Sequence, residues 1–230
     1  STYRKVHHFE FPEGLRRIGN SNFKSSTIKK VVLPSTLEEL GDEVFSSCES
    51  LEEIVLPDKL KRIPYKAFFL CENLSKLNWP EELEEIGEKA FLLANLPSEV
   101  ILPKSVKHIS ASAFRGWVNP IENFVLPDGI NTIEPYTFFT RELPNGVVMP
   151  NSVRRIGYRA FELCQLQNIV IPEGVEYLGQ RCYLDNHATQ VSLPSTLKYI
   201  DKRAFENNNF ETVILPDGLK TIGVYAFYNN

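Results

Sequence analysis

The sequence predicts a strand-rich repeat solenoid of the α/β type, a right-handed coil with a parallel sheet and about ten repeats of 22–24 residues. Three observations predict it. A proline recurs at this interval, apolar residues stand at fixed distances from it, and an aromatic residue follows it eleven positions later. The recurring residues are Pro12, Pro34, Pro57, Pro80, Pro103, Pro127, Pro150, Pro172, Pro194 and Pro216.

Five positions of the repeat are hydrophobic in every copy. With the proline as origin, positions −3, −1, +3 and +6 are always apolar and position +11 is always aromatic. In the third copy these residues are Ile54, Leu56, Leu60, Ile63 and Phe68. All length variation falls between the aromatic residue and the next proline. Because loops absorb insertions and packed segments do not, the variable bend is expected after the aromatic residue.

The residues before each proline predict a short strand. Alternation of side chains points Ile54 and Leu56 inward and Val55 outward. The proline cannot donate a hydrogen bond to a sheet, so we expect it to end the strand. Pairs such as Asp128-Gly129 then favour a turn.

A second extended segment and a bend complete each repeat. Residues 60–63 are predicted to be extended, and the following Ala67-Phe68 pair predicts a helical turn with the aromatic ring in the core. No unit of this size can bury its own apolar face, but stacked units can, with strands about 4.8 Å apart. We therefore expect residues 1–230 to form a single solenoid domain.

These residues resemble a known family. The pattern L-x-x-I-x-L-P-x-x-L-x-x-I-G-x-x-A-F-x-x-C fits residues 51–71, with Pro64 where glycine is usual. It is similar to the leucine-rich repeats of the BspA type, also called the Treponema pallidum type, and covers essentially the whole chain. Pro97, Pro144 and Ala188 depart from it at the early leucine, and the usual asparagine ladder of common leucine-rich repeats is missing.

The ends of the sequence carry expectations of their own. The chain begins and ends within a repeat and shows no polar capping unit, so we expect a longer parent protein or unusual packing at the ends. No charged and then apolar leader follows Ser1, which leaves the native gene's leader open. No run of about 18 apolar residues predicts a membrane span in this stretch.

The composition and motifs argue against an enzyme and against a nucleic-acid binder. The net charge of −4 lacks the basic excess that displaces counterions from nucleic acid. No phosphate-binding, zinc-binding or nucleophile motif occurs, so we expect no catalytic, cofactor or metal site and no small-molecule substrate. Carboxylate pairs such as Glu52-Glu53 are interpreted as solvated surface. The histidines are interpreted in the same way: His7, His8, His108 and His187.

The four cysteines are predicted to be small buried residues. Cys48, Cys71 and Cys164 share the position three after the aromatic residue, and Cys182 takes the alanine position. Cys48 and Cys71 stand in adjacent coils, within disulfide range along the backbone, but stacked side chains that point in parallel suit a bond poorly. Whether they are bonded stays open.

The outward strand position, two before each proline, is the candidate binding surface. It is β-branched and apolar in seven of ten copies. One interpretation is strand propensity, since such residues favour strands even in water. The other is a docking strip for a protein partner, since contiguous exposed apolar area marks interaction sites. The seven candidate residues are Val32, Val55, Ile101, Val125, Val148, Val170 and Ile214.

The resemblance implies a function that spacing alone does not. Proteins with this repeat type are associated with bacterial cell surfaces, which implies an extracellular or cell-surface binding module that adheres to host or other cell-surface proteins. The alternative is a structural spacer or self-assembling stalk without its own ligand. Charge is banded, with seven Lys or Arg against two Glu in residues 1–30 and eight acids against one Lys in residues 31–60. Such banding either steers a partner or keeps the surface soluble.

Overall fold

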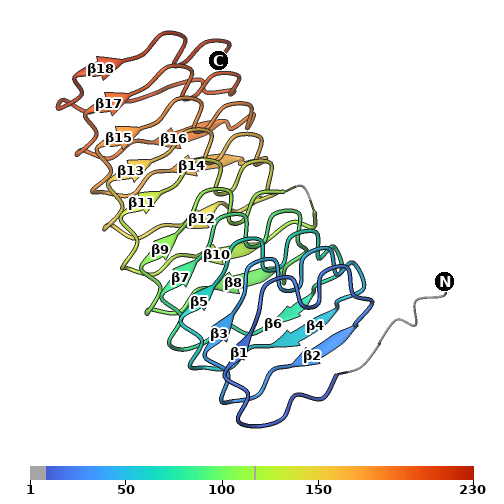
Figure 1. Ribbon diagram of the computed structural model, residues 1–230. Coiled ribbons are helices and arrows are strands. Elements are labelled where there is room, and N and C mark those ends of the chain that lie inside the picture. Colours follow the sequence, from blue (N-terminus) through green and yellow to red (C-terminus); the bar gives the residue numbers. More distant parts are fainter. Residues whose placement is uncertain (1–8, 117) are drawn as a thin grey trace. The chain divides into compact units, whose positions relative to one another are not determined.

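The chain folds into two compact units. The computed structural model describes residues 9–116 and 118–230 (Figure 1). Unit 1 comprises Ser1–Pro97 and Pro103–Phe114, and unit 2 comprises Ser98–Leu102 and Arg115–Asn230. In most coils of both units a first strand precedes the proline and a second strand follows it, as the sequence predicts. Among the described residues, the coils of Pro12 and Pro216 have the second strand alone.

Unit 1 contains three parallel sheets. The first strands pair in the order β2-β4-β6, and the second strands pair as β1-β3 and β5-β7-β9. The register aligns equivalent repeat positions, for example Val32 with Val55 and Ile63 with Ile86. The bounds are β1 (Arg17–Ile18), β2 (Lys30–Val32), β3 (Glu39–Leu40), β4 (Glu53–Val55), β5 (Arg62–Ile63), β6 (Lys76–Leu77), β7 (Glu85–Ile86) and β9 (His108–Ile109).

Unit 2 repeats this arrangement. Its first strands pair as β8-β10-β12 and β14-β16, and its second strands form the five-stranded sheet β11-β13-β15-β17-β18. All of these pairings are parallel. The bounds are β8 (Glu99–Ile101), β10 (Asn123–Val125), β11 (Thr132–Ile133), β12 (Val147–Val148), β13 (Arg155–Ile156), β14 (Asn168–Val170), β15 (Tyr177–Leu178), β16 (Gln190–Ser192), β17 (Tyr199–Ile200) and β18 (Thr221–Ile222).

The predicted inward residues form the core of each unit. Ile54, Leu60 and Phe68 are at most 1% exposed. The aromatic residues at position +11 stack coil on coil, with ring centroids 5.2–5.8 Å apart from Phe23 to Phe114 in unit 1. The corresponding spacing in unit 2, from Phe138 onward, is 5.1–5.6 Å. This spacing is slightly wider than the strand spacing of a sheet, as tilted stacked rings require.

The helical turn predicted at Ala67-Phe68 is not formed, and the described residues contain no helix. The bend is a series of tight turns, in which Ala67 N–H donates to Pro64 O at 3.2 Å. The alternate N–H groups of Lys66, Phe68 and Leu70 instead donate to the next coil, at 3.1, 2.8 and 3.0 Å. A helix would keep all these donors within one coil, so bonding between coils excludes it.

Left-handed backbone at non-glycine residues makes this bend possible. Lys66 and Leu70 have φ angles of 49° and 57°, and every described coil has a residue of positive φ at position +9. Such a conformation costs about 1–2 kcal/mol per residue. The inter-coil hydrogen bonds that it permits offset this cost, at roughly 0.5–1.5 kcal/mol each.

Cysteine and asparagine play one structural part on the inner side of the bend. Cys48, Cys71 and Cys164 are buried and free, and each thiol donates to the aromatic residue's carbonyl in the preceding coil, at 2.9–3.2 Å. Asn186 and Asn208 occupy the same position and donate to the equivalent carbonyls at 2.8 and 2.9 Å. At this position of the bend, thiols and amides therefore link neighbouring coils.

Candidate protein-interaction surfaces

The strip residues of unit 1 form a short exposed pair. Val32 and Val55 lie in register on β2 and β4, with 53% and 38% of their surface exposed. Asn78 takes the next place in the row. Its side-chain oxygen accepts from Leu56 N–H at 2.7 Å and its nitrogen donates to Leu56 O at 2.8 Å. The Asn78 side chain thus takes the place of backbone hydrogen bonds between the two strands, and the apolar row ends after two residues.

The strip residues of unit 2 form a longer row. Ile101, Val125 and Val148 lie in register on β8, β10 and β12. Ile101 and Val148 are more than half exposed and Val125 is half-buried. Val170 follows on β14 and is 68% exposed. Ile214 is exposed, but it lies outside any strand, and nothing in the structure explains why its segment stays unpaired.

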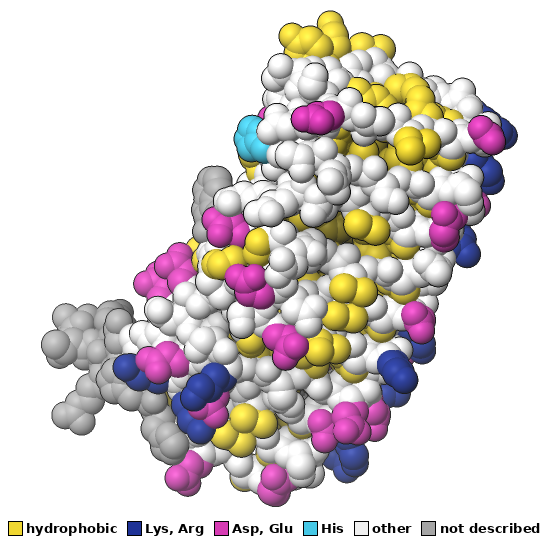
Figure 2. Space-filling model, turned by 180° about the vertical axis from the view of Figure 1, so that it is seen from behind, with side chains coloured by type: hydrophobic (Ala, Val, Ile, Leu, Met, Phe, Trp, Pro, Cys, Tyr) yellow, Lys and Arg dark blue, Asp and Glu magenta, His cyan; other side chains and the backbone are white. Residues whose placement is uncertain are grey.

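Strand geometry accounts for this exposure. The neighbours Val100 and Phe124 point to the opposite face and are fully buried, so the alternation of each strand sends the strip outward. Figure 2 shows hydrophobic side chains gathered in patches on the face seen from behind. The name "unit 2 strip" is used below for Ile101, Val125, Val148 and Val170.

Charges beside the strip of unit 1 are neutralised between coils. Lys29 Nζ lies 3.3 Å from Glu52 Oε1, and Lys30 Nζ lies 2.8 Å from Glu53 Oε1. The hydrogen bond from Lys30 holds the pKa of Glu53 below its usual value, against the smaller opposing effect of desolvation. Basic residues on one coil therefore face acidic residues on the next.

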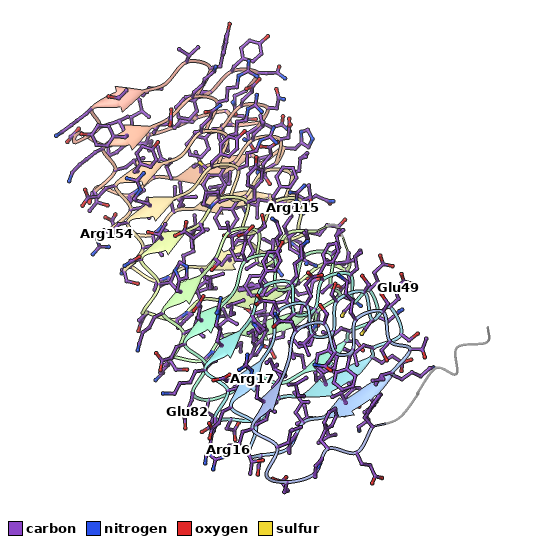
Figure 3. The ribbon with its side chains drawn as sticks, viewed as in Figure 1. Arg16, Arg17, Glu49, Glu82, Arg115 and Arg154 are labelled. Carbon is purple, nitrogen blue, oxygen red and sulfur yellow. The ribbon has the colours of Figure 1, made fainter. Side chains whose placement is uncertain are left out.

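The second-strand face of unit 1 shows the same alternation. Arg17 on β1 pairs with Glu39 on β3 at 3.5 Å, and Arg62 on β5 pairs with Glu85 on β7 at 3.4 Å. The side chains immediately before these strands pair likewise, with Arg16 3.3 Å from Glu38 and Lys61 3.7 Å from Glu84. Figure 3 shows Arg16, Arg17 and Glu82 projecting from this face.

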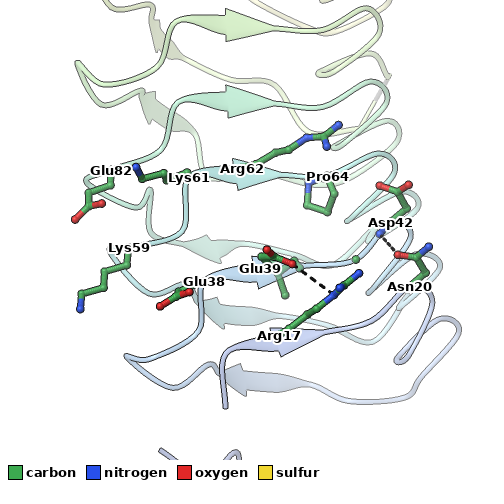
Figure 4. Close-up of a pocket in the computed structure, with 12 residues that line it drawn as sticks. Arg17, Asn20, Glu38, Glu39, Asp42, Lys59, Lys61, Arg62, Pro64 and Glu82 are labelled. Atoms are coloured by element: carbon green, nitrogen blue, oxygen red, sulfur yellow. Dashed lines mark hydrogen bonds and ion pairs between the residues drawn. The ribbon is translucent and has the colours of Figure 1, made fainter. Parts of the chain in front are cut away.

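A hollow of about 680 Å³ lies among these charges in unit 1 (Figure 4). Arg17, Glu39, Lys61 and Arg62 line it, and Asn20 Oδ1 accepts from Asp42 N–H at 3.0 Å beside it. The lining combines both signs of charge in exposed ion pairs, each worth about 0–1 kcal/mol. It therefore offers a ligand no excess of either charge, although Leu40 and Pro64 add apolar groups to its lining.

Unit 2 places aromatic and cationic side chains together, which the sequence analysis did not anticipate. The Arg115 guanidinium carbon lies 4.7 Å from the Phe139 ring centroid, and that of Arg155 lies 4.4 Å from the Tyr177 ring centroid. The signal in the sequence is the pairing of equivalent positions in neighbouring coils, such as Arg155 with Tyr177. Each of these guanidinium groups therefore forms a cation–π contact with an aromatic ring of its own unit.

Other ionisable groups do not assemble into a chemical centre. His108 and His187 are exposed, while His7 and His8 lie outside the described residues. In the described part of the chain, no group of three or more His, Cys, Asp or Glu side chains could hold a metal ion. Nor does any helix within residues 9–116 and 118–230 have the length and hydrophobicity of a membrane-spanning segment.

The cysteines and one glutamate have shifted pKa values. Burial raises the pKa of the Cys48 thiol to about 11, and it raises those of Cys71, Cys164 and Cys182 further. Burial also raises the pKa of Glu162 to about 7, although Arg159 Nε lies 3.0 Å from its carboxylate. The thiols are therefore protonated at neutral pH and act as buried hydrogen-bond donors.

Comparisons with known proteins agree with this architecture. Structures with related folds include a leucine-rich repeat protein from Bacteroides ovatus, with 25% identity and a TM-score of 0.60 over 94% of this chain and 68% of that one. A leucine-rich cell surface protein from Faecalibacterium prausnitzii shares 23% identity with a TM-score of 0.54, over 83% of this chain and 45% of that one. A T. pallidum leucine-rich repeat protein shares 23% identity with a TM-score of 0.47, over 78% and 64% of the two chains.

The family follows from the sequence match. No curated protein matches the chain. The model of the BspA type leucine-rich repeat region, which contains six copies, matches residues 2–119 and 116–230. Because these matches cover nearly the whole sequence, the chain belongs to the BspA-type leucine-rich repeat family.

Proposed function

We propose that the chain is a protein-binding module of a bacterial surface or secreted protein, and that the unit 2 strip is its contact surface. The observation that carries this proposal is the exposed row of Ile101, Val125 and Val148 on three paired strands. Isolated exposed apolar residues are common on soluble proteins, but a contiguous row marks an interaction site.

Burial of the unit 2 strip by a partner would contribute a useful part of the binding free energy. Full burial of one valine or isoleucine side chain contributes roughly 1.5–3 kcal/mol. The members of the strip are already partly covered by their neighbours, so each contributes less than that when a partner covers it. Val32 and Val55 in unit 1 offer a smaller contact, because Asn78 ends their row.

Location at the cell surface is part of the same proposal. The related F. prausnitzii protein is described as a leucine-rich cell surface protein. The chain spans 45% of that protein and 68% of the B. ovatus protein. Adhesion to host or other cell-surface proteins is thus proposed for this module.

A paired set of variants tests the proposal. Val125→Lys with Val148→Lys places two charges in the middle of the strip, and Thr132→Lys places one on a second strand of the same unit. The full-length protein, unmodified or carrying either set, is immobilised and exposed to extracellular-matrix and serum proteins. Thermal unfolding of each variant shows whether it is folded.

We expect the strip variant to lose its retained proteins and the Thr132→Lys control to keep them. Retention by a folded strip variant at the level of the unmodified protein would contradict the proposal. Retention of nothing by the unmodified protein would also contradict it, and would favour a structural spacer.

A further inference from the structure

We infer that the unit 2 strip binds a basic polypeptide segment, an amphipathic helix whose apolar row is flanked on both sides by Lys or Arg. This inference rests on the proposed function and adds the chemistry of the partner. Its basis is the distribution of charge around the strip, which differs from that of every other face of the two units.

Exposed and half-buried carboxylates border the strip on both sides. Glu99 lies on β8, Glu122 immediately precedes β10 and Asp128 follows it. Further along unit 2, Glu142 lies in the bend five residues before β12, one acid follows β14 and two flank Ile214. These seven residues are called the acidic margin: Glu99, Glu122, Asp128, Glu142, Glu173, Glu211 and Asp217.

No basic residue of unit 2 lies on this face. Arg154, Arg155, Lys198 and Lys220 lie on or immediately before its second strands, and Figure 3 shows Arg154 projecting from that side. The remaining Lys and Arg side chains of unit 2 belong to the bends: Arg115, Arg141, Arg159, Arg181, Lys202 and Arg203. One base does lie beside the strip: Lys104, assigned to unit 1, follows Ile101 by three residues and holds the repeat position that Asp128 and Glu173 occupy in later coils.

The acidic margin keeps its charge. Among the described residues, none of its seven carboxylates forms an ion pair. Neutral groups hold several of them in place instead. Asn123 donates to Glu99 at 3.2 Å, Asn145 donates to Glu122 at 3.2 Å, and Gln165 donates to Glu142 at 2.9 Å.

Neutral donors orient a carboxylate without cancelling its charge. The Ser195 hydroxyl and backbone N–H hold Glu173 in the same way, at 2.9 and 3.1 Å. The strip is therefore an apolar row bordered by more acids than bases, with Glu99 and Glu122 on one side and Asp128 and Glu173 on the other. A basic partner gains net electrostatic attraction there, while an acidic partner is repelled.

A hollow of about 600 Å³ among the bends beside Glu142 fits a long basic side chain. Leu163 and Leu166 provide apolar walls, and Glu142 and Asp185 provide carboxylates. Lysine and arginine carry a hydrocarbon stem with a charged head, which matches such a lining. The hollow includes Gln167, the residue immediately before β14, so it adjoins the strip.

Spacing favours a helix over an extended strand as the occupant. Neighbouring strands of a sheet lie about 4.8 Å apart, a helical turn advances about 5.4 Å, and same-face residues of a strand lie about 6.7 Å apart. Over the three steps from Ile101 to Val170, a helix drifts from the row by about 2 Å and a strand by about 6 Å. A helix can therefore place one apolar side chain on each coil.

Designed probes test the inference on the whole 230-residue chain. The first is a stapled synthetic helix with one row of leucines flanked on both sides by lysines. The second has glutamates in place of the lysines, and the third has the composition of the first in shuffled order. Binding is followed by NMR shifts of the valine and isoleucine methyl groups, which report both affinity and location.

We expect the lysine probe to bind at the unit 2 strip at least tenfold more tightly than either of the other two. Raising the salt concentration to about 0.3 M should weaken the binding of the lysine probe, because salt screens the attraction between exposed charges. The variant E122Q/E142Q/E173Q should lose about tenfold in affinity. The matched control E134Q/E176Q/D201N changes three acids elsewhere in unit 2 and should bind the lysine probe as the unmodified chain does.

The failures of the two proposals are distinguishable. Equal binding of the lysine and glutamate probes at the strip would overturn the inference and leave the proposed function standing. Absence of shifts at the strip with the lysine probe, or shifts elsewhere only, would overturn the inference as well. Unchanged binding of that probe to the folded Val125→Lys, Val148→Lys variant would count against both.

Discussion

Unit 1 and unit 2 share one repeat and one core but distribute their charges in opposite ways. In unit 1, Arg or Lys on one coil is followed by Glu at the same repeat position of the next coil, and several of these charges pair, as Arg17 does with Glu39 and Lys30 with Glu53. In unit 2 the bases lie on or beside the second strands and in the bends, and the charged residues of unit 2 beside the strip are acids. The repeat fixes the core residues but not the surface charges. Surface charges can therefore pair within the chain, as in unit 1, or attract a partner.

The alternation of positive and negative side chains in unit 1 adds little to stability. Its main effect is to favour one order of stacked coils. Its ion pairs are exposed, with 71% and 65% of the Arg17 and Glu39 side chains accessible, so each pair contributes little. A coil stacked out of order would bring like charges together, which is unfavourable. Repeats with nearly identical cores need such a distinction, because hydrophobic packing alone does not tell one coil from another.

The largest expected effect is on the core, and it tests whether the two units unfold together. Phe68→Ala in unit 1 and Phe161→Ala in unit 2 each remove a fully buried ring and should cost about 3–5 kcal/mol. The single domain predicted for residues 1–230 requires that each variant lower one common transition in chemical denaturation. Two separate transitions, each responding to only one variant, would contradict the single domain.

The bend ladder should show an intermediate effect that differs between units. Asn208 Oδ1 accepts from Ala188 N–H at 3.0 Å, and its Nδ2 donates to Tyr183 O and Phe205 O. Asn208→Ala leaves Ala188 N–H and Tyr183 O without this partner, while Phe205 O keeps its bond from Asn230, and should cost roughly 1–3 kcal/mol. Cys71→Ala removes one weak thiol bond and should cost less, as urea titration of both variants would show. Equal costs would mean that thiol and amide are equivalent in the bend.

Stability should depend on pH through Glu162 in unit 2. Its folded pKa of about 7 exceeds the ordinary value of 4.5, so the folded state binds more protons between these values and loses stability as pH rises through them. Glu162→Gln should therefore raise the free energy of unfolding at pH 8 by an amount on the order of 1–3 kcal/mol, seen as a higher melting temperature, and should change it little at pH 4. A gain that is the same at both pH values would contradict this origin.

Glu43 in unit 1 should make stability depend on pH in the opposite direction. A hydrogen bond from Lys24 lowers the pKa of its carboxyl, so its contribution is present at neutral pH and is lost as pH falls. Glu43→Gln should slightly lower the melting temperature at neutral pH and have no effect in acid. Together, the two variants compare a paired surface carboxylate with a buried one.

The smallest expected effect is that of a single surface charge. Arg17→Glu places a glutamate beside Glu39 and should cost less than about 1 kcal/mol at low salt. The exchange Arg17→Glu with Glu39→Arg should restore most of the loss, and high salt should abolish the difference. Glu211→Lys in unit 2 changes an exposed acid outside every ion pair described above and should leave stability unchanged. A larger cost for Glu211→Lys than for Arg17→Glu would contradict the contrast between the units.

The core and both strand positions could be predicted from sequence because they have constant spacing. Residues such as Leu60 and Phe68 keep a fixed distance from proline, and packing allows no variation there. The conformation of the bend could not be predicted, because Lys66 and Leu70 adopt left-handed backbone conformations. In a sequence, such conformations are usually indicated by glycine. Inter-coil hydrogen bonds, which no single repeat displays, impose that conformation.

Two features of the surfaces were readable in the sequence but needed a comparison between coils. Asn186 and Asn208 share a repeat position with Cys71, which a column-by-column alignment of repeats reveals. The alternation of Arg17, Glu39 and Arg62 appears in the same way. The strip was identified from alternation within strands, whereas its interruption at Asn78 depends on a side-chain conformation that spacing does not specify.

The two-coil periodicity of charge in unit 1 limits how this part of the chain can be shortened or lengthened. Excising the coil that carries Glu38 and Glu39 would bring Arg16 and Arg17 against Lys61 and Arg62, four cations with no acid between them. Excising that coil together with a neighbour would keep opposite signs in contact. Natural or engineered length variants of this region should accordingly differ by even numbers of coils.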